Sequence, residues 1–315
     1  LEGVISLTDK EPKGAKFVPG SASVTVENGT TVKDVAMNGQ FLTWKGELDK
    51  GGIDVISDIW DPDNGFSGGT PFGYLNLPDW FGVPPLARSS VCDHTTITLT
   101  GLPPFRFDGQ VYTSIVIGSN GLFVPGDDDT DAFSPFNQDL PDAATPNPIA
   151  PFWTDLDLDG TNDDDTGAGN IYAAVFNSGA FTIIEWHGVE EWNVPGVTYT
   201  FQVQIGNIGS GYEGIWFTYP ELQGVPSFLT VGAENVTGTG GSNYYFDGEG
   251  TFPIEGFMGE LKVIELIGGT ATINFQMEAD CLAPAIVNEA TVSTAGQAER
   301  AVAVTRCEGS RGRKR

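Results

Sequence analysis

The chain has 315 residues and a formal net charge of -27 at pH 7, from 42 acidic residues against 15 Lys and Arg. Residues 51–261 hold 29 of the acidic residues and two of the basic ones, whereas the two flanks are balanced at 13 against 13. A field this negative repels nucleic acid and anionic lipid. We therefore expect no nucleic-acid partner, and we expect an acidic insert between two ends that belong together.

The composition is typical of strands and turns. The chain has 42 Gly and 20 Pro and is rich in Thr, Val, Ile and aromatic residues, and no segment shows convincing 3.6-residue apolar periodicity. No apolar run reaches the roughly 18 residues of a membrane span, so we expect no membrane insertion. The chain begins at Leu1 without a signal-peptide pattern, which favours a mature or excised piece. The predicted fold class is all-β.

Several segments have the pattern of antiparallel strands and tight turns. Residues 119–121 form a Ser-Asn-Gly turn, and an Asn-Ser-Gly-Ala connection predicts a hairpin of 171–176 with 181–186. Apolar and polar residues alternate most clearly in the segments 197–205, 215–219 and 271–277. We expect half-buried strands, with one face on a core and the other in water.

A series of phrases in the insert resembles a known protein region. The phrases lie at 73–78, 117–122, 137–142, 146–155, 184–186, 200–206, 229–235 and 245–251. In this order they resemble the C-terminal accessory region of secreted bacterial subtilisin-like serine proteases, over about residues 70–275. The Pro-Phe-Trp-Thr-Asp sequence at 151–155 is also similar to nidogen-type extracellular domains. The resemblance implies a location outside the cell or on its surface.

The flanks resemble a different module. The segments at 8–23, 42–48 and 286–293 look like the sandwich repeat of bacterial and archaeal surface proteins. This resemblance implies an immunoglobulin-like sandwich formed by 1–56 plus 270–308, split by an acidic β-sandwich insert at 57–269 and followed by a basic tail at 309–315. Such repeats open with a strand ahead of the Thr-Asp turn, and the chain starts too late to contain it. We therefore expect the first strand to be missing.

The sequence encodes no recognisable catalytic set. A subtilisin-type enzyme needs Ser, His and Asp, but the chain has only His94 and His187 and no Gly-Thr-Ser nucleophile turn. Glycoside hydrolysis would need two carboxylates about 5 to 10 Å apart, and Glu185, Glu190 and Glu191 are candidates. In so acidic a chain, strand carboxylates usually face water. We expect no enzyme activity from this chain, which leaves a protease domain elsewhere in the parent protein open.

The strongest constellation is a run of acids at 155–165. Asp155, Asp157, Asp159 and Asp163 fall at positions 1, 3, 5 and 9 of a calcium loop with Gly160 at the turn. Position 12 is Thr instead of Glu and no helices flank the loop, so this is not an EF-hand. The alternative is an exposed turn with Leu156 and Leu158 inward. We favour calcium, and treat the acids at 127–131 as a weaker second candidate.

Three further sets of residues complete the candidates. Cys281 and Cys307 flank a predicted strand pair and form a candidate disulfide, which leaves the state of Cys92 undetermined. An aromatic platform for sugar or protein competes with core packing for Trp186, Trp192, Trp216, Tyr199, Tyr244 and Tyr245. The tail contributes candidate assembly residues that could dock on the acidic insert of a neighbouring chain, namely Arg311, Arg313, Lys314 and Arg315.

Two functional hypotheses follow. The first is a non-catalytic extracellular β-sandwich module of subtilisin-like protease origin, used for adhesion, substrate docking or surface assembly. The second is a structural subunit of an extracellular filament or surface layer, in which an incomplete sandwich recruits a strand from another copy. Carbohydrate is a possible ligand under the first hypothesis, and other copies of the chain are the expected partners under the second.

Overall fold

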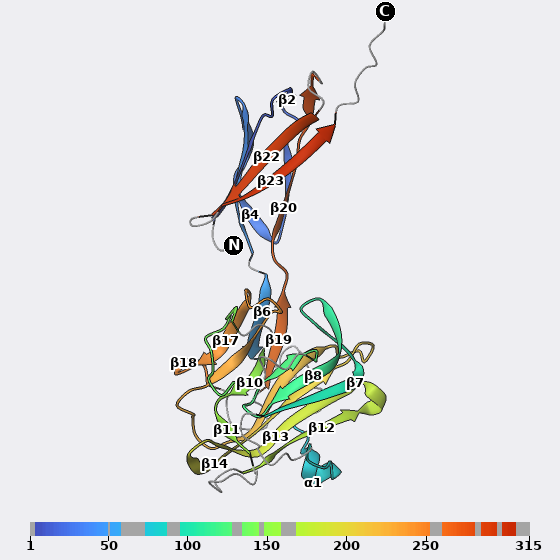
Figure 1. The fold of residues 1–315 in the computed structure, drawn as a ribbon, viewed down its shortest axis with the longest axis vertical. Helices are drawn as coiled ribbons and strands as arrows, with labels where there is room; N and C mark the ends of the chain where they lie inside the picture. The colour runs from blue at the N-terminus through green and yellow to red at the C-terminus, as the bar shows by residue number, and fades with distance from the viewer. Residues whose placement is uncertain are drawn as a thin grey trace, which may run out of the picture. The chain divides into compact units, whose positions relative to one another are not determined.

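A computed structural model describes residues 4–49, 51–57, 73–86, 95–127, 134–144, 148–158, 168–252, 260–280, 285–294 and 298–306. The chain forms two compact units, each with its own strands (Figure 1). Unit 1 comprises Leu1–Gly51 with Ile267–Arg315, and unit 2 comprises Gly52–Leu266. Unit 1 is thus built from both ends of the chain, and the acidic segment forms unit 2.

Unit 1 contains an antiparallel sheet of order β23-β22-β1-β5-β4. Its strands are β1 (Val4–Lys10), β4 (Gly29–Asn38), β5 (Phe41–Leu48), β22 (Ala285–Ser293) and β23 (Ala298–Arg306). Strand β1 pairs with β22 on one side and with β5 on the other. Thr8 and Asp9, predicted as a turn, lie within β1 and meet the closing-strand sequence, because Asn288 donates a hydrogen bond of 2.8 Å to the buried carboxylate of Asp9.

The opposite layer of unit 1 consists of two short ladders among the described residues. Strand β2 (Ala15–Phe17) pairs with β21 (Met277–Ala279), and β3 (Ser23–Glu27) pairs with β20 (Thr270–Asn274). The single strand predicted at 271–277 is therefore two strands. The chain breaks at Phe275, whose ring packs edge-on against Phe17, and changes partner from β3 to β2.

The boundary between the units differs slightly from the one inferred from sequence. Strand β6 (Gly52–Ser57) pairs along its length with β19 (Glu260–Leu266), so residues 52–56 lie in unit 2. Both ends of the insert thus leave unit 2 as neighbouring strands of one sheet.

The described residues of unit 2 form two seven-stranded antiparallel sheets. The first contains β7 (Thr96–Phe107), β8 (Gln110–Gly118), β9 (Phe123–Pro125), β10 (Ile149–Trp153), β16 (Thr230–Glu234), β17 (Gly241–Phe246) and β18 (Glu249–Gly250). The second contains β6, β11 (Leu156–Asp157), β12 (Asn170–Phe176), β13 (Phe181–Glu191), β14 (Val194–Gly206), β15 (Gly214–Leu222) and β19. The predicted all-β fold class is confirmed, and helix is nearly absent from the described residues.

One large apolar core joins strands of both sheets. Phe152 of the first sheet packs on Tyr199 and Phe201 of the second, with ring centroids 4.9 and 5.1 Å apart, and Trp186 stacks on Phe201 at 5.0 Å. Contacts of this kind bury the apolar faces that the alternating patterns predict. Burial of these faces makes unit 2 a sandwich.

The predicted hairpin and the predicted strand at 197–205 are present, but the polar face of the strand at 197–205 is not in water. Strands β12 and β13 pair from Asn170 to Phe176, as the connection between them predicts. In β14 the side chains that alternate with the core residues are also buried, including Gln202 and Gln204, both 0% exposed. The expectation of half-buried strands is wrong here, because residues 73–86 cover this second face.

Candidate functional site

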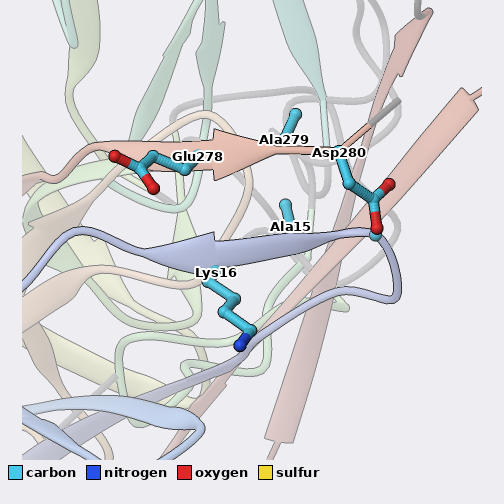
Figure 2. A pocket seen from close by; sticks show the side chains of 6 residues that line it. Ala15, Lys16, Glu278, Ala279 and Asp280 are labelled. Carbon is cyan, nitrogen blue, oxygen red and sulfur yellow. The ribbon is translucent and has the colours of Figure 1, made fainter. Parts of the chain in front are cut away.

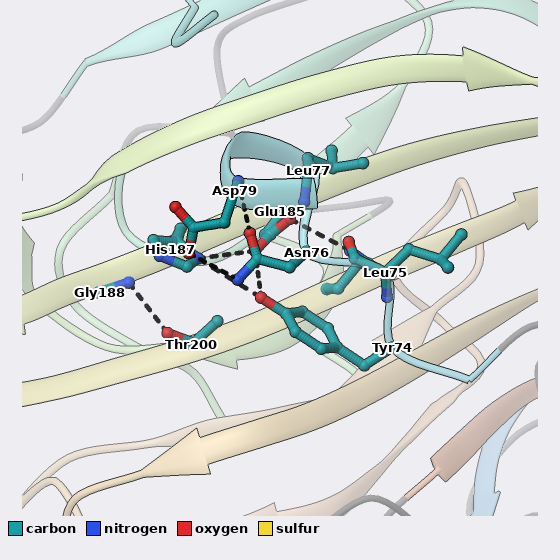
Figure 3. Close-up of polar contacts among 10 residues, drawn as sticks. Tyr74, Leu75, Asn76, Leu77, Asp79, Glu185, His187, Gly188 and Thr200 are labelled. Atoms are coloured by element: carbon teal, nitrogen blue, oxygen red, sulfur yellow. Dashed lines mark hydrogen bonds and ion pairs between the residues drawn. The ribbon is translucent and has the colours of Figure 1, made fainter. Parts of the chain in front are cut away.

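A buried carboxylate marks the most unusual site in unit 2. Glu185 of β13 is 0% exposed. Its Oε1 accepts a hydrogen bond of 2.5 Å from the Tyr74 hydroxyl and lies 2.8 Å from His187 Nδ1 (Figure 3). Its Oε2 accepts bonds from the Leu77 backbone N–H at 2.8 Å and from Gln202 Nε2 at 3.3 Å. Both carboxylate oxygens are therefore engaged by the protein itself, as burial of a charge demands.

The two glutamines of β14 bind the same covering segment, residues 73–86, which we call the strap. Gln202 donates to the Leu75 carbonyl at 2.7 Å and accepts from the Leu75 N–H at 3.3 Å. Its side-chain amide thus satisfies both backbone groups of Leu75, as a neighbouring strand would. Gln204 donates to the Gly73 carbonyl at 2.6 Å. Leu77 is fully buried and packs with Phe181 and Ile183. Polar side chains and one apolar anchor thus hold the strap on the sheet.

The strap contains the short helix α1 (Leu77–Phe81). Asn76 caps its N-terminus by accepting a 2.8 Å bond from the Asp79 N–H, and Pro78 lies in the first turn where its missing N–H costs nothing. Gly82 ends the helix with φ of 62°, a conformation that glycine adopts without strain. The helix leaves Trp80 and Phe81 58% and 49% exposed. The strap therefore exposes two large aromatic side chains to solvent.

The charges of the site stabilise one another. The hydrogen bond to Glu185 raises the pKa of His187 above its usual value of 6.5, and the negative charges of Glu185, Asp79 and Glu221 add to this against the opposing effect of burial. Burial and the bond to Glu185 raise the pKa of the Tyr74 hydroxyl far beyond physiological pH. Tyr74 is therefore a neutral hydrogen-bond donor, and the raised pKa of His187 favours a protonated imidazole beside Glu185.

We predict a stability that depends on the charge of His187. A histidine whose folded pKa is raised stabilises the folded state below its unfolded value of 6.5, and the contribution is lost as pH rises through the folded pKa. Wild type should therefore exceed His187→Gln in free energy of unfolding at pH 5.5, with the difference shrinking toward pH 9. Urea unfolding across this range measures it. A difference that is constant with pH would show that His187 does not pair with Glu185 as a cation.

The other two candidate glycosidase carboxylates have separate neighbours. Glu190 Oε1 accepts from the Gly196 N–H at 2.7 Å, and Glu191 Oε2 accepts from the Tyr199 hydroxyl at 3.3 Å. Burial raises the pKa of Glu191, and the charge of Asp155 raises it further, while bonds from Tyr199 and the Ser227 backbone lower it. The expectation that these strand carboxylates face water is wrong for Glu185 and Glu190, which are both buried.

The start of the acidic loop is well anchored. The turn at 119–121 lies beneath it, where the buried Asn120 accepts from the Leu156 N–H with its side chain at 2.9 Å and from the Thr154 N–H with its carbonyl at 3.2 Å. Leu156 and Leu158 point into the core, as the exposed-turn alternative requires, yet Asp157 is only 1% exposed. In β11 Asp157 lies opposite Glu190, so acidic residues of two strands adjoin.

Several candidate residues lie outside the described part of the chain. These are Asp159, Asp163, His94, Cys92, Cys281, Cys307, Arg311, Arg313, Lys314 and Arg315. The part that the structure describes contains no group of three or more His, Cys, Asp or Glu side chains placed to hold a metal ion. The calcium site, the disulfide and the tail contacts therefore remain predictions.

The aromatic residues first considered as a platform do not form one. Trp186, Trp216, Tyr199 and Tyr245 are buried, and Trp192 is exposed on a turn. A pocket in unit 1, lined by Gly14, Ala15, Lys16, Glu278, Ala279 and Asp280, lies at the β2 and β21 ladder (Figure 2). It brings together none of the candidate site residues.

Comparison with known proteins identifies part of unit 2. Residues 93–247 match the family model described as NIDO related. This match includes 151–155 and agrees with their nidogen-type similarity, so residues 93–247 of unit 2 are similar to NIDO-related domains. No curated protein matches the chain, and no solved structure matches it. These comparisons do not link the chain to subtilisin-like proteases or to surface-protein repeats.

The strap is an element that the strand patterns do not predict, and residues 73–78 entered the sequence analysis only through a resemblance. A local signal for its helix exists, because Asn76 followed by Pro78 and Asp79, with Gly82 after them, is a helix start and stop signal. Tyr74 had no signal of its own. Its partner Glu185 is 111 residues away, and no local pattern predicts that contact.

Proposed function

We propose that the chain is a non-catalytic extracellular module of a secreted or surface protein, which docks the parent protein on a surface through the strap. The NIDO-related match supports an extracellular location, and the described residues include no helix with the length and hydropathy of a membrane span. The subtilisin-like protease resemblance of the sequence suggests an exoprotease as the parent protein.

One observation supports this proposal most: the buried acid of the site is used entirely for anchoring. A reaction centre needs a carboxylate or histidine that can reach a substrate. Here Tyr74, Leu77, Gln202 and His187 engage both oxygens of Glu185. What the strap offers to solvent is Trp80 and Phe81, and exposed aromatics are common anchors of binding surfaces.

The docking role is tested with labelled chain and the surface of the source cells. Wild type should bind, and Trp80→Ala with Phe81→Ala should reduce binding about tenfold or more, since aromatic anchors dominate such contacts. Phe228→Ala is the matched control, because Phe228 is 67% exposed elsewhere in unit 2. Equal loss in both variants would reject the strap as the docking surface. Purified chain should also remain unlabelled by a serine-directed phosphonate.

We also propose calcium binding at the acidic loop, which would suit the same extracellular role. Asp155 and Asp157, with Asp159 and Asp163 farther along the loop, would supply hard oxygen ligands, and calcium would neutralise their mutual repulsion. The buried position of Asp157 and its place opposite Glu190 favour a cation there. In this proposal calcium is structural and fixes the loop.

A second candidate function is a subunit of an extracellular assembly in which copies join by strand donation. The specific observation in its favour is β23, in which every described side chain from Ala298 to Arg306 is exposed. A strand this weakly packed could leave its own unit and enter another. Concentration-dependent growth of open-ended oligomers, lost on truncation after Thr294, would support donation.

A further inference from the structure

The two edges of the five-stranded sheet in unit 1 differ in how they are protected. Strand β4 has two register irregularities against β5, between Thr31 and Lys33 and between Lys33 and Ala36, and presents charged Lys33 and Asp34 at the edge. Bulges and charges of this kind discourage pairing with another chain. The β4 edge is therefore blocked.

Strand β23 lacks these protections. It pairs with β22 over nine successive residues, Ala285 to Ser293 against Arg306 to Ala298, with no register shift. The strand contains no Pro or Gly, and its central residues 301–304 are uncharged. No described strand pairs with its outer side. A long, regular edge with an uncharged centre is a template for another strand.

The outer face beside this edge is apolar. Val287, Val302 and Val304 are 47%, 56% and 62% exposed, and Val304 lies directly opposite Val287. At the end of this stripe, Arg300 forms an ion pair with Glu289 of its own sheet. A strand added to β23 would cover the valines while leaving that pair intact.

The charge distribution favours a second copy of the chain as the partner of the β23 edge. Unit 1 carries 12 acidic and 12 basic residues, whereas unit 2 carries 30 acidic and three basic ones. Two copies therefore repel through unit 2 and meet with least repulsion through unit 1. The sequence of β23 is also self-complementary, because antiparallel pairing about Val302 puts Ala301 opposite Ala303.

The same register places Arg300 opposite Val304 and Glu299 opposite Thr305 of the other copy. No like charges then face each other directly, and the two Val302 side chains meet at the centre. We infer that two copies associate edge to edge along β23, antiparallel about a two-fold axis at Val302, so that their two sheets become one. Such an isologous contact closes on itself and gives a dimer. It involves unit 1 alone and is independent of the docking role of unit 2.

The test measures association of the full chain by sedimentation over a concentration series. Wild type should form a dimer, more strongly at higher salt because repulsion between the acidic units is screened. Val302→Lys should weaken the dimer about tenfold or more, since two lysines then face each other at the axis. Val287→Lys is the matched control. It changes the same exposed stripe on a strand that is already paired on both sides, and should have a smaller effect.

Charge complementation tests the register itself. Val302→Glu alone should also dissociate the dimer, and mixing it with Val302→Lys should restore dimers containing one of each chain. Should either variant melt below wild type, Val304→Lys, which faces Arg300 of the other copy, replaces it. Three results would overturn the inference: a monomeric wild type, dimers unaffected by Val302→Lys, or failure of the mixture to associate. Open-ended oligomers would favour strand donation instead.

Discussion

Glu185→Leu should lower the free energy of unfolding of unit 2 by about 3 to 5 kcal/mol, the usual cost of breaking a buried charged network by removing one partner. The change leaves the Tyr74 hydroxyl, the Leu77 N–H and the His187 imidazole without the Glu185 carboxylate. For a unit of this size the melting temperature should fall by on the order of 10 °C. Thermal unfolding followed by circular dichroism measures the shift.

Two variants show whether the loss comes from the network. Glu185→Gln keeps an acceptor oxygen and should cost less than the leucine variant, because only the charged part of the bonding is lost. Glu249→Leu, at an exposed glutamate of β18, should change stability by less than about 0.5 kcal/mol. If Glu185→Leu melted within a degree of wild type, Glu185 would not anchor the strap.

Calcium should raise the melting temperature of the chain relative to EDTA. A ligand that binds only the folded state at a hundred times its Kd stabilises it by about 2.7 kcal/mol, which corresponds to roughly 5 to 10 °C for a unit of this size. The expected cause is neutralisation of the carboxylates at 155–163, where Asp155 already raises the pKa of Glu191. Differential scanning calorimetry in the two conditions measures the rise.

The calcium prediction has a control within the chain. Asp157→Asn combined with Asp159→Asn should remove the rise, whatever it does to the baseline stability in EDTA. Asp127→Asn changes an exposed acid of the weaker second cluster and should leave the rise intact. If Asp127→Asn alone removed the rise, calcium would bind at 127–131 and not at 155–163. An equal melting temperature of wild type with and without calcium would reject calcium binding.

Local patterns predicted the strands of unit 2 because alternation and turn residues act over a few positions. The hairpin of β12 and β13 and the long strand β14 lie where period two and the Asn-Ser-Gly connection place them. The same patterns misplaced the polar face of β14, since a strap more than a hundred residues earlier covers Gln202 and Gln204. Burial of the second face is a tertiary property that no strand pattern contains.

In the candidate site too, local sequence patterns indicate single residues but not the contacts between them. Asp155 and Asp157 could be named from spacing, and the turn at 119–121 could be named from its residues, but their meeting through Asn120 follows from the fold. The sequence presents Glu185 and His187 only as separate residues of a predicted strand. Their pairing depends on Tyr74 and Leu77, which reach them only when the strap crosses the sheet.

Glu185 is the anchor that holds the strap and its aromatic residues on the sheet. Amide hydrogen exchange, read by mass spectrometry over peptides of 73–86 and of β14, tests this anchoring most directly. We expect slow exchange of both segments in wild type, and in Glu185→Gln a selective rise in exchange of the strap, with the core strand still protected. Unchanged exchange of the strap in Glu185→Gln, or an equal rise in both segments, would contradict it.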